Sequence, residues 1–333
     1  VPSRRVTNDD LAAKLDTGDE WIRSHTGIGA RHIAGDGIAA SDLALEAARN
    51  ALTQAVENRL VPETSVNGLA ETLDLIVLGT STPDYHVCPA VACIVQEGLG
   101  ASRAAAMDIG AGCSGFVYGL ETAAGLLEFH GGRKRALVIG AEVLSRFMDW
   151  NDRSTCVLFG DGAGAVLIEK TKASREGPGK RGILRTILGS DGSGADYLMV
   201  RKGGSRNAYR AGDIVDVPPH VEMNGRAVYN FAVKKVSETI VQLLSEENIT
   251  IDDLGRIVPH QANARIIQAA AKRLGIPEGK FFMNIEEYAN TSAASIPLAL
   301  DELNRSGGIA RGDMILIAGF GAGLTYGGGL IVW

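Results

Sequence analysis

Short runs in which every residue is apolar alternate along the chain with longer stretches of helical pattern. Runs of this kind predict strands that are buried on both faces of a sheet. The clearest are Leu75–Gly79, Ala136–Ile139 and the Gly-rich segment from Gly162, then Ile257–Pro259, Ile315–Ala318 and the Gly-rich segment from Gly327. Regular alternation of such strands with helices is typical of an α/β fold.

The same order of elements occurs twice. In each half a buried strand is followed by an apolar helix, which is expected to start at Cys113 in the first half and near Asn290 in the second. A second buried strand and a Gly-rich strand then complete each half. This duplication predicts two similar halves packed against each other, residues 1–172 and 173–333.

The connection between the halves, Thr171–Arg181, is rich in Lys, Arg, Gly and Pro and is expected to be exposed. After it, the second half has one additional early strand, Ile183–Leu188. No counterpart of that strand is found in the first half. Because the sequence also lacks an initiator Met, we expect the counterpart to precede Val1.

Composition and charge narrow the classes of function. Of the 333 residues 45 % are hydrophobic, and the formal net charge is −6, so no overall positive field attracts nucleic acid. No apolar run approaches the ~18 residues of a membrane span. The four cysteines have neither the spacing of a metal site nor the density of a disulfide framework. These features predict reduced thiols in a cytoplasmic protein.

Two Gly-rich segments invite comparison with a dinucleotide loop: Gly160-Asp-Gly-Ala-Gly and Gly319-Phe-Gly-Ala-Gly. Neither has the Gly-x-Gly-x-x-Gly spacing at a turn from strand to helix. The sequence also shows no cluster of metal-ligating residue types. We therefore expect neither a nicotinamide cofactor nor a metal.

One cysteine has an unusual neighbourhood. A lone cysteine in an apolar segment is most often a small buried hydrophobe, but Cys113 stands within Gly110-Ala-Gly-Cys-Ser-Gly at the start of an expected helix. Flanking glycines permit a tight turn and the close approach of a substrate. A helix N-terminus favours the thiolate form of a thiol. Cys113 is therefore a candidate nucleophile.

Two further polar residues occupy comparable positions. His260 follows the strand Ile257–Pro259, and Asn290 precedes the second apolar helix. Taken alone, the histidine could be a satisfied core residue and the asparagine a helix N-cap. With Cys113, however, they stand at the ends of buried strands or the starts of buried helices, and such places converge on one crevice in α/β folds. We expect the three side chains to meet.

The motifs around these residues resemble the β-ketoacyl-acyl-carrier-protein synthase III family of thiolase-like condensing enzymes. The resemblance covers nearly the whole chain and rests on Asp16-Thr-Gly-Asp-Glu-Trp-Ile, Thr26-Gly-Ile-Gly-Ala-Arg-His-Ile, Gly110-Ala-Gly-Cys-Ser-Gly-Phe, Phe159-Gly-Asp-Gly-Ala-Gly-Ala, Val258-Pro-His-Gln-Ala-Asn, Asn290-Thr-Ser-Ala-Ala-Ser and Gly319-Phe-Gly-Ala-Gly-Leu-Thr-Tyr-Gly. It implies an α/β thiolase fold, with two similar β-α-β-α-β-type halves in a five-layered αβαβα arrangement, and a homodimer.

The resemblance also implies a role for each catalytic group. Cys113 would take the acyl group of an acyl-CoA primer. His260 and Asn290 would stabilise the enolate that malonyl-acyl-carrier protein forms when it loses carbon dioxide. Backbone N–H groups of Cys113 and Ala322 would hold the oxyanion, with Ala322 replacing the usual glycine. Thiolases carry a second, late cysteine and elongating ketosynthases a second histidine, but no cysteine follows Cys156 and no histidine follows His260.

Coenzyme A is thus implied as part of a substrate and not as a resident cofactor. By resemblance it is bound by Thr17, Trp21, Arg153, Gly225 and Asn263, with Trp21 stacked on the adenine. For Trp21 the simpler alternative is core packing. His25 stands where the family often has an arginine, and a neutral imidazole binds phosphate less well than a guanidinium.

Two surfaces for the remaining substrate groups are expected. The acidic carrier protein would dock on Arg265, Lys272 and Arg273, which share a broad face of the helix after His260; an ordinary solvated face is the alternative.

The acyl pocket would be lined by Val157, Leu158 and Phe159 and by Cys88, which replaces a bulky aromatic residue of the family. By resemblance, Cys88 closes the pocket of the partner subunit. Its small side chain predicts use of primers longer than acetyl.

Two alternatives to the primer-condensing synthase stay open. One is a specialised synthase of secondary metabolism with the same fold and a different primer or nucleophile. The other is a non-catalytic subunit that binds the carrier protein, although the complete set of Cys113, His260 and Asn290 speaks against it.

Overall fold

The computed structural model describes residues 1–129, 131–171, 181–215 and 218–333. Its strands are β1 (Arg5–Thr7), β2 (Ala30–His32), β3 (Leu75–Gly79), β4 (Ala105–Ile109), β5 (Arg135–Glu142), β6 (Gly162–Glu169), β7 (Gly182–Ser190), β8 (Leu198–Val200), β9 (Val221–Met223), β10 (Arg256–Pro259), β11 (Met314–Gly321) and β12 (Thr325–Val332).

The α-helices are α1 (Asn8–Ala12), α2 (Asp19–Thr26), α3 (Ala40–Glu57), α4 (Val66–Ala70), α5 (Val91–Leu99), α6 (Gly115–Phe129), α7 (Gly225–Glu246), α8 (Ala264–Leu274), α9 (Ile285–Tyr288) and α10 (Ser295–Arg305). Two of the short 3-10 helices, η1 (Gly112–Ser114) and η7 (Ser292–Ala294), matter for the site because they precede α6 and α10.

Two mixed sheets form the centre of the molecule, with strand orders β4-β3-β5-β6 and β10-β11-β12-β7. In the first sheet β3 runs parallel to β5, which runs antiparallel to β6. In the second, β10 runs parallel to β11, which runs antiparallel to β12. The predicted repeat of strand order is therefore confirmed. The proposed boundary between residues 172 and 173 lies outside the described residues.

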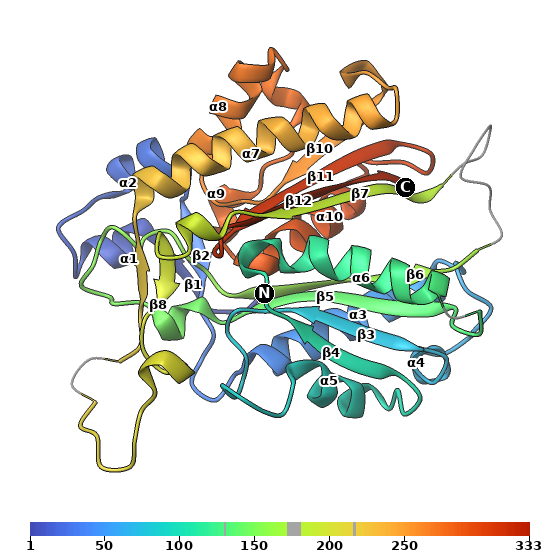
Figure 1. Cartoon of the computed structure of the whole chain (residues 1–333), viewed down its shortest axis with the longest axis horizontal. Coiled ribbons are helices and arrows are strands. Elements are labelled where there is room, and N and C mark those ends of the chain that lie inside the picture. Colours follow the sequence, from blue (N-terminus) through green and yellow to red (C-terminus); the bar gives the residue numbers. More distant parts are fainter. Residues whose placement is uncertain (130, 172–180, 216–217) are drawn as a thin grey trace.

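Helices and sheets stack in five layers (Figure 1). Helix α7 covers the outer face of the second sheet, α6 and α10 lie between the sheets, and α3 and α5 cover the outer face of the first. This arrangement is the expected αβαβα order of a thiolase fold. Among the described residues, no helix is both long and apolar enough to cross a membrane.

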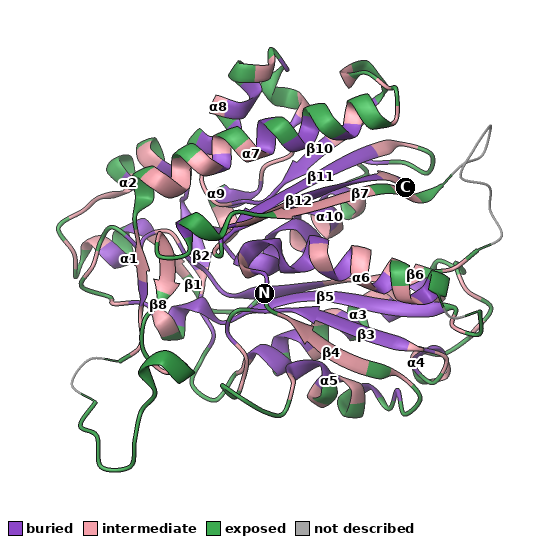
Figure 2. Cartoon of the chain, in the orientation of Figure 1, coloured by how far each residue is buried: buried purple, intermediate pink, exposed green. Residues whose placement is uncertain are grey.

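The burial of the strands explains their sequence pattern. Every residue of β3 and of β5 is buried, because helices cover both faces of that sheet (Figure 2). Strand β4 is different: it is the outer strand of its sheet and most of its residues are only half buried. The pattern of continuous apolar residues is weaker there, and the sequence did not predict this strand.

Both central helices begin later than predicted. Helix α6 begins at Gly115 and not at Cys113, and α10 begins at Ser295 and not near Asn290, since the 3-10 helices η1 and η7 come first. Close packing accounts for these tight turns. A Cβ atom on Gly140 of β5, for example, would collide with the backbone of η7.

Candidate active site

Cys113 lies in η1, between the edge strand β4 and the buried helix α6. The turn is pressed against the end of β11, where a Cβ atom on Gly321 would collide with the Cys113 backbone nitrogen. The Cys113 residue is only 7 % exposed. It opens onto a cavity of about 300 Å³ whose lining includes Phe159, Ser292 and Ala322.

The helix start was expected to favour the thiolate form of Cys113, but burial acts more strongly in the opposite direction. Burial raises the pKa of the Cys113 thiol to about 12, although a hydrogen bond from Ser292 and the backbone N–H groups of Cys113 and Ala322 act in the opposite direction. Desolvation of the charged form therefore outweighs the helix start and its donors. Cys113 is therefore mainly a thiol in the resting protein.

His260 directly follows β10, and its backbone N–H donates to the Ala318 carbonyl oxygen of β11 at 2.8 Å. The imidazole is buried, with its edge towards the ring of Phe320 at a centroid distance of 5.0 Å. Burial lowers the pKa of His260 to about 3. The ring is therefore neutral at physiological pH.

A serine determines which ring nitrogen of His260 faces the site. The Ser295 hydroxyl lies 2.6 Å from Nδ1, and its oxygen also accepts the backbone N–H of Gln261 at 3.4 Å. That leaves the hydroxyl proton for Nδ1. A neutral ring that accepts at Nδ1 carries its own proton on Nε2, so this arrangement favours the tautomer that can donate to a substrate oxygen.

Asn290 lies between α9 and η7 and is fixed by backbone bonds to a neighbouring segment. Its N–H donates to the Leu158 carbonyl at 2.9 Å, and its carbonyl accepts the Gly160 N–H at 3.0 Å. Its side-chain Oδ1 accepts the backbone N–H of Ser292 at 2.8 Å. The amide is thereby oriented so that its Nδ2 donor stays available.

Strand β11 brings the three predicted residues together. Pro259, next to His260, pairs with Ala318 of β11. The 3-10 helix η1, which contains Cys113, packs on the same strand. The 3-10 helix η7, which follows Asn290, packs on η1. Along its described lining, the cavity includes Cys113 but neither His260 nor Asn290. Both residues are buried.

The predicted acyl pocket is met only in part. Phe159 lines the cavity, whereas Val157 and Leu158 are absent from its described lining. Val157 is buried behind the wall, in the same apolar cluster as Phe159 and Leu144. Cys88 is exposed on the loop after β3. The sequence missed most of the apolar wall, which includes Leu144, Phe147, Leu198 and Val221. These residues come from segments with no motif of their own.

Three of the predicted coenzyme A residues lie near one another. The Arg153 guanidinium is 5.5 Å from the centre of the Trp21 ring, and Asn263 donates to the His25 carbonyl at 3.2 Å. His25 itself stacks on Trp21, with centroids 4.5 Å apart. Trp21 is 39 % exposed, so it is not a core residue. An adenine ring on Trp21 would compete with His25 or Arg153 for a face of the indole.

The other two coenzyme A residues differ in their surroundings. The Thr17 hydroxyl is buried and has no hydrogen-bond partner among the described residues. Gly225 is exposed at the first position of α7, and a Cβ atom there would meet only Met223, at 3.7 Å. Thr17 thus offers an unsatisfied polar group, and Gly225 an open backbone.

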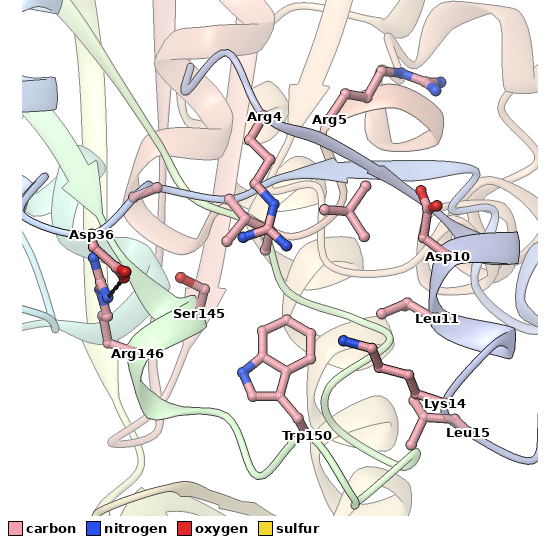
Figure 3. Close-up of a pocket in the computed structure, with 13 residues that line it drawn as sticks. Arg4, Arg5, Asp10, Leu11, Lys14, Leu15, Asp36, Ser145, Arg146 and Trp150 are labelled. Carbon is pink, nitrogen blue, oxygen red and sulfur yellow. Dashed lines mark hydrogen bonds and ion pairs between the residues drawn. The ribbon is translucent and has the colours of Figure 1, made fainter.

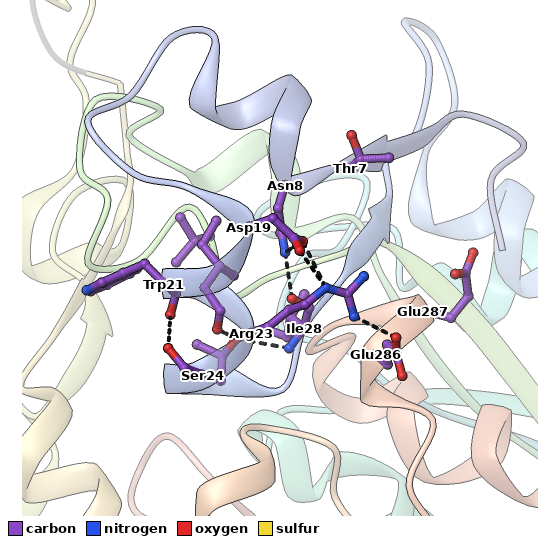
Figure 4. Close-up of polar contacts among 12 residues, drawn as sticks. Thr7, Asn8, Asp19, Trp21, Arg23, Ser24, Ile28, Glu286 and Glu287 are labelled. Carbon is purple, nitrogen blue, oxygen red and sulfur yellow. Dashed lines mark hydrogen bonds and ion pairs between the residues drawn. The ribbon is translucent and has the colours of Figure 1, made fainter.

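A polar network holds the helix that carries Trp21 (Figure 4). Asn8 donates to Asp19 at 2.8 Å and to the Ile28 carbonyl at 2.7 Å. Arg23 of α2 bonds Asp19 at 2.9 Å and also reaches Glu286 of α9 at 2.6 Å. Helix α2 is therefore tied to the segment that leads into Asn290.

The predicted docking residues are all exposed on α8. Arg265 donates from Nε to the Ser24 carbonyl at 2.9 Å, which links α8 to α2. Arg273 lines a groove that also contains Glu238 and Glu246. The Lys272 side chain has no hydrogen bond or ion pair among the described residues, and the docking surface stays a prediction.

A separate, larger cavity of about 570 Å³ contains none of the predicted site residues (Figure 3). Val6, Leu11 and Leu15 form apolar parts of its wall. Figure 3 shows Arg4 and Lys14 near the Trp150 indole, while Arg146 is paired with Asp36 at 3.3 Å.

Sequence reasoning assigned no role to three polar residues that contact the site: Ser292, Ser295 and Glu142. The two serines stand inside the motif that begins at Asn290, so their presence was visible but their partners were not. Glu142 ends an otherwise apolar buried strand. A carboxylate at such a position is a usable signal.

Comparisons with known proteins agree with this geometry. Residues 107–192 match the family model for 3-oxoacyl-[acyl-carrier-protein (ACP)] synthase III, and residues 244–333 match the model for its C-terminal part. A relative from Clostridium acetobutylicum, a beta-ketoacyl-[acyl-carrier-protein] synthase III, is 44 % identical over 100 % of this chain and 96 % of its own length.

Solved structures give the same picture. The 3-oxoacyl-[acyl-carrier-protein] synthase III of Aquifex aeolicus is similar with a TM-score of 0.87 and 40 % identity, covering 100 % of this chain and 97 % of that one. The priming β-ketosynthase of the R1128 polyketide biosynthetic pathway is similar with a TM-score of 0.85 and 35 % identity, covering 99 % and 92 %.

Fold and site together define a thiolase-like condensing enzyme, which is an acyltransferase. The chain belongs to the β-ketoacyl-[acyl-carrier-protein] synthase III family, whose condensing activity initiates fatty acid synthesis.

Proposed function

We propose that this chain transfers an acyl group from an acyl-CoA primer to Cys113 and condenses it with malonyl-acyl-carrier protein. The observation that carries the proposal is that Cys113 and Ala322 both line the cavity and that hydrogen bonding by their backbone N–H groups lowers the pKa of the Cys113 thiol. A carbonyl oxygen attached to that sulfur would lie beside both donors, as an oxyanion hole requires.

In the loading step the Cys113 sulfur attacks the thioester carbonyl of the primer. The new carbon–sulfur bond replaces the bond to coenzyme A, and the proton of the Cys113 thiol ends on the departing coenzyme A sulfur. Trp21 and Arg153 lie together at the surface, and we assign binding of the nucleotide end to them and to the buried Thr17 hydroxyl, which has no hydrogen-bond partner among the described residues. Asn263 and Gly225 complete the proposed channel.

In the condensation step malonyl-acyl-carrier protein loses carbon dioxide, and the electron pair of the broken bond forms an enolate. The Nε2 proton of neutral His260 and the Nδ2 donor of Asn290 stabilise the enolate oxygen. The carbanion then attacks the acyl carbon on Cys113, and the cysteine sulfur leaves. The product is a β-ketoacyl-carrier protein with two more carbons than the primer.

The test is direct. Incubation with acetyl-CoA should add the mass of one acetyl group to the Cys113 peptide, and addition of malonyl-acyl-carrier protein should then release carbon dioxide and give acetoacetyl-carrier protein. Acylation of a different cysteine would overturn the assignment of the nucleophile.

We also propose a homodimer. Strand β4 has β3 as its partner and no second partner within the described chain, and the nearby loop exposes Tyr85 and Val87, the latter by 92 %. An edge strand without a second partner, next to exposed apolar side chains, is typical of a two-fold interface between subunits. Light scattering should give twice the chain mass.

The four cysteines are free, which fits a protein of the reducing cytoplasm.

A second candidate is a priming synthase of secondary metabolism. The apolar wall of the cavity, with Leu144, Phe147 and Leu198, accommodates chains beyond acetyl, and the similar R1128 enzyme is named as a priming β-ketosynthase of a polyketide pathway. Intact-protein mass spectrometry with a panel of acyl-CoA thioesters separates the two candidates. Preferential loading of acetyl supports the fatty acid role, and exclusion of acetyl supports the second.

A further inference from the structure

A buried carboxylate lies next to the proposed nucleophile. Glu142 ends β5, is fully buried, and accepts hydrogen bonds from two segments. The Thr82 hydroxyl donates at 2.6 Å and the Ser81 backbone N–H at 3.1 Å, both from the loop after β3. The Ser292 hydroxyl donates to Oε1 at 2.9 Å from η7, across 150 positions of sequence.

Ser292 also lies beside Cys113. Both residues line the same cavity, and hydrogen bonding by the Ser292 side chain lowers the pKa of the Cys113 thiol. A hydroxyl has a single proton to donate, so Ser292 cannot donate to a Glu142 carboxylate and to a Cys113 thiolate at once. It can donate to the thiolate only when Glu142 is protonated and donates to the serine in turn.

We infer that Cys113, Ser292 and Glu142 form one hydrogen-bonded unit, here called the serine link, in which Cys113 and Glu142 share a single ionisable proton. In one state Glu142 is the anion, Ser292 donates to it and Cys113 is a thiol. In the other state, protonated Glu142 donates to the Ser292 hydroxyl, and Ser292 donates to Cys113. Glu142 is then neutral and Cys113 is a thiolate. Glu142 is thereby a positioning residue that acts on the nucleophile through Ser292.

The surroundings of Glu142 support this sharing. Burial raises the pKa of Glu142 to about 7, and its hydrogen-bond donors lower it only partly. The Glu142 charge in turn helps to raise the pKa of Cys113. The groups that face the carboxyl are hydroxyls and backbone amides from the 80–82 loop and η7, and the thiol from η1. Asp161, beside β6, bonds Ser145 and Ala34 instead.

Such a unit has a characteristic pH dependence. Below pH 7 Glu142 is neutral, and the thiolate fraction of Cys113 rises about tenfold for each pH unit. Above pH 7 the pair holds one negative charge, and a second is opposed by the first. The thiolate fraction should then become nearly constant, although the pKa of the thiol lies far above that range.

The experiment measures alkylation of Cys113 by iodoacetamide between pH 6 and pH 9, read on the Cys113 peptide because Cys88 and Cys93 are exposed and also react. The native protein should show a rate that rises to about pH 7 and then levels. Glu142→Gln removes the titrating partner and can donate its amide to Ser292, so its rate should keep rising and exceed the native rate about tenfold at pH 8.

Further variants separate this role from a structural one. Glu142→Asp should restore the levelling. Ser292→Gly removes the link; since the φ of Ser292 is 49°, glycine fits the backbone there, and alkylation should fall at every pH. Glu121→Gln, a carboxyl change on α6, is the matched control and should keep the native profile. Thermal melting at each pH shows which variants are folded.

A native rate that rises steadily through pH 7 to pH 9 overturns the serine link without the need for any variant. Levelling that persists in folded Glu142→Gln overturns it as well. The inference takes Cys113 to be the nucleophile proposed above, but alkylation reads the thiol itself. If acylation is found on another cysteine while the levelling is present, the proposed function fails and the serine link stands.

Discussion

The two halves of the molecule share an order of three strands, β3-β5-β6 and β10-β11-β12, but carry different chemistry at equivalent places. The first strand of the repeat is β3 in the first half and β10 in the second. The hydroxyl residues Thr80 and Thr82 follow β3, whereas His260 follows β10. The middle position of the 3-10 helix that follows is Cys113 in η1 and Ala293 in η7. The second strand ends in Glu142 in the first half and in Gly321 in the second.

This difference shows how a duplicated fold becomes asymmetric. The first half supplies the proposed nucleophile and a buried carboxyl, and the second half supplies the proposed neutral donors and small residues. Gly321 leaves room for the Cys113 turn, so the second half makes space for the chemistry of the first. Each half provides what the other lacks at the same position of the repeat.

The sharpest way to break the comparison is Cys113→Ala, which makes the middle positions of η1 and η7 identical. Acyl transfer and condensation should both fall to background, because no covalent acyl intermediate can form. The measurement is the mass shift with acetyl-CoA together with formation of β-ketoacyl-carrier protein. A variant that still condenses at more than a trace rate would remove Cys113 from its role.

The next largest effect is expected for Asn290→Ala, which removes a donor of the second half. Decarboxylation and condensation should fall by roughly 10²–10³, the usual cost of one oxyanion donor, while loading of Cys113 is largely kept. The half-reactions are followed separately, by carbon dioxide release and by the acyl mass shift. Loss of loading with normal decarboxylation would contradict the division of work between the halves.

Much of this asymmetry could be predicted from the sequence. The buried strands and the repeat followed from continuous apolar runs. The three proposed reactive residues were predicted from their places at strand ends and helix starts, and their roles stay predictions. The edge strand β4 was missed because partial exposure breaks the apolar pattern. The protonated state of Cys113 and the contact between Ser292 and Glu142 were beyond prediction because burial and long-range pairing decide them, and neither is written in local sequence.

A smaller effect is expected on the surface of the second half. Lys272→Glu on α8 should lower kcat/KM for malonyl-acyl-carrier protein roughly three- to tenfold at low salt, since charge complementarity acts mainly on association. Loading from acyl-CoA should not change. Lys134→Glu, an equal charge change at the start of the first half's sheet, is the control. Arg265→Glu is less clean, because Arg265 also bonds Ser24 of the helix that carries Trp21.

If Lys272→Glu leaves kcat/KM for malonyl-acyl-carrier protein and its salt dependence unchanged, the proposed docking surface is wrong. An equal loss in Lys134→Glu would show only a general effect of net charge. Comparison of Lys272→Glu with Lys134→Glu therefore shows whether the position of the charge matters, since the change in charge is the same in both.

The smallest effect concerns the depth of the acyl pocket, which the proposed partner would complete. Cys88 is exposed on the loop after β3 and does not line the described part of the cavity of its own chain, so it can limit the acyl chain only from the other subunit. A buried methylene is worth about 0.8 kcal/mol, or about fourfold in kcat/KM. Native protein should therefore use butyryl-CoA at least as well as acetyl-CoA, and Cys88→Phe should shift preference back to acetyl by a similar factor per carbon.

The matched control is Cys93→Phe. Cys93 is also exposed and lies five residues further along the chain, in α5. The control should leave the order of primers unchanged while adding the same bulk. Values of kcat/KM for acetyl-, butyryl-, hexanoyl- and branched acyl-CoA decide the matter. Strict acetyl preference in the native protein, unaltered by Cys88→Phe, would place the end of the pocket in the chain's own wall, where Leu144, Phe147 and Phe159 already stand.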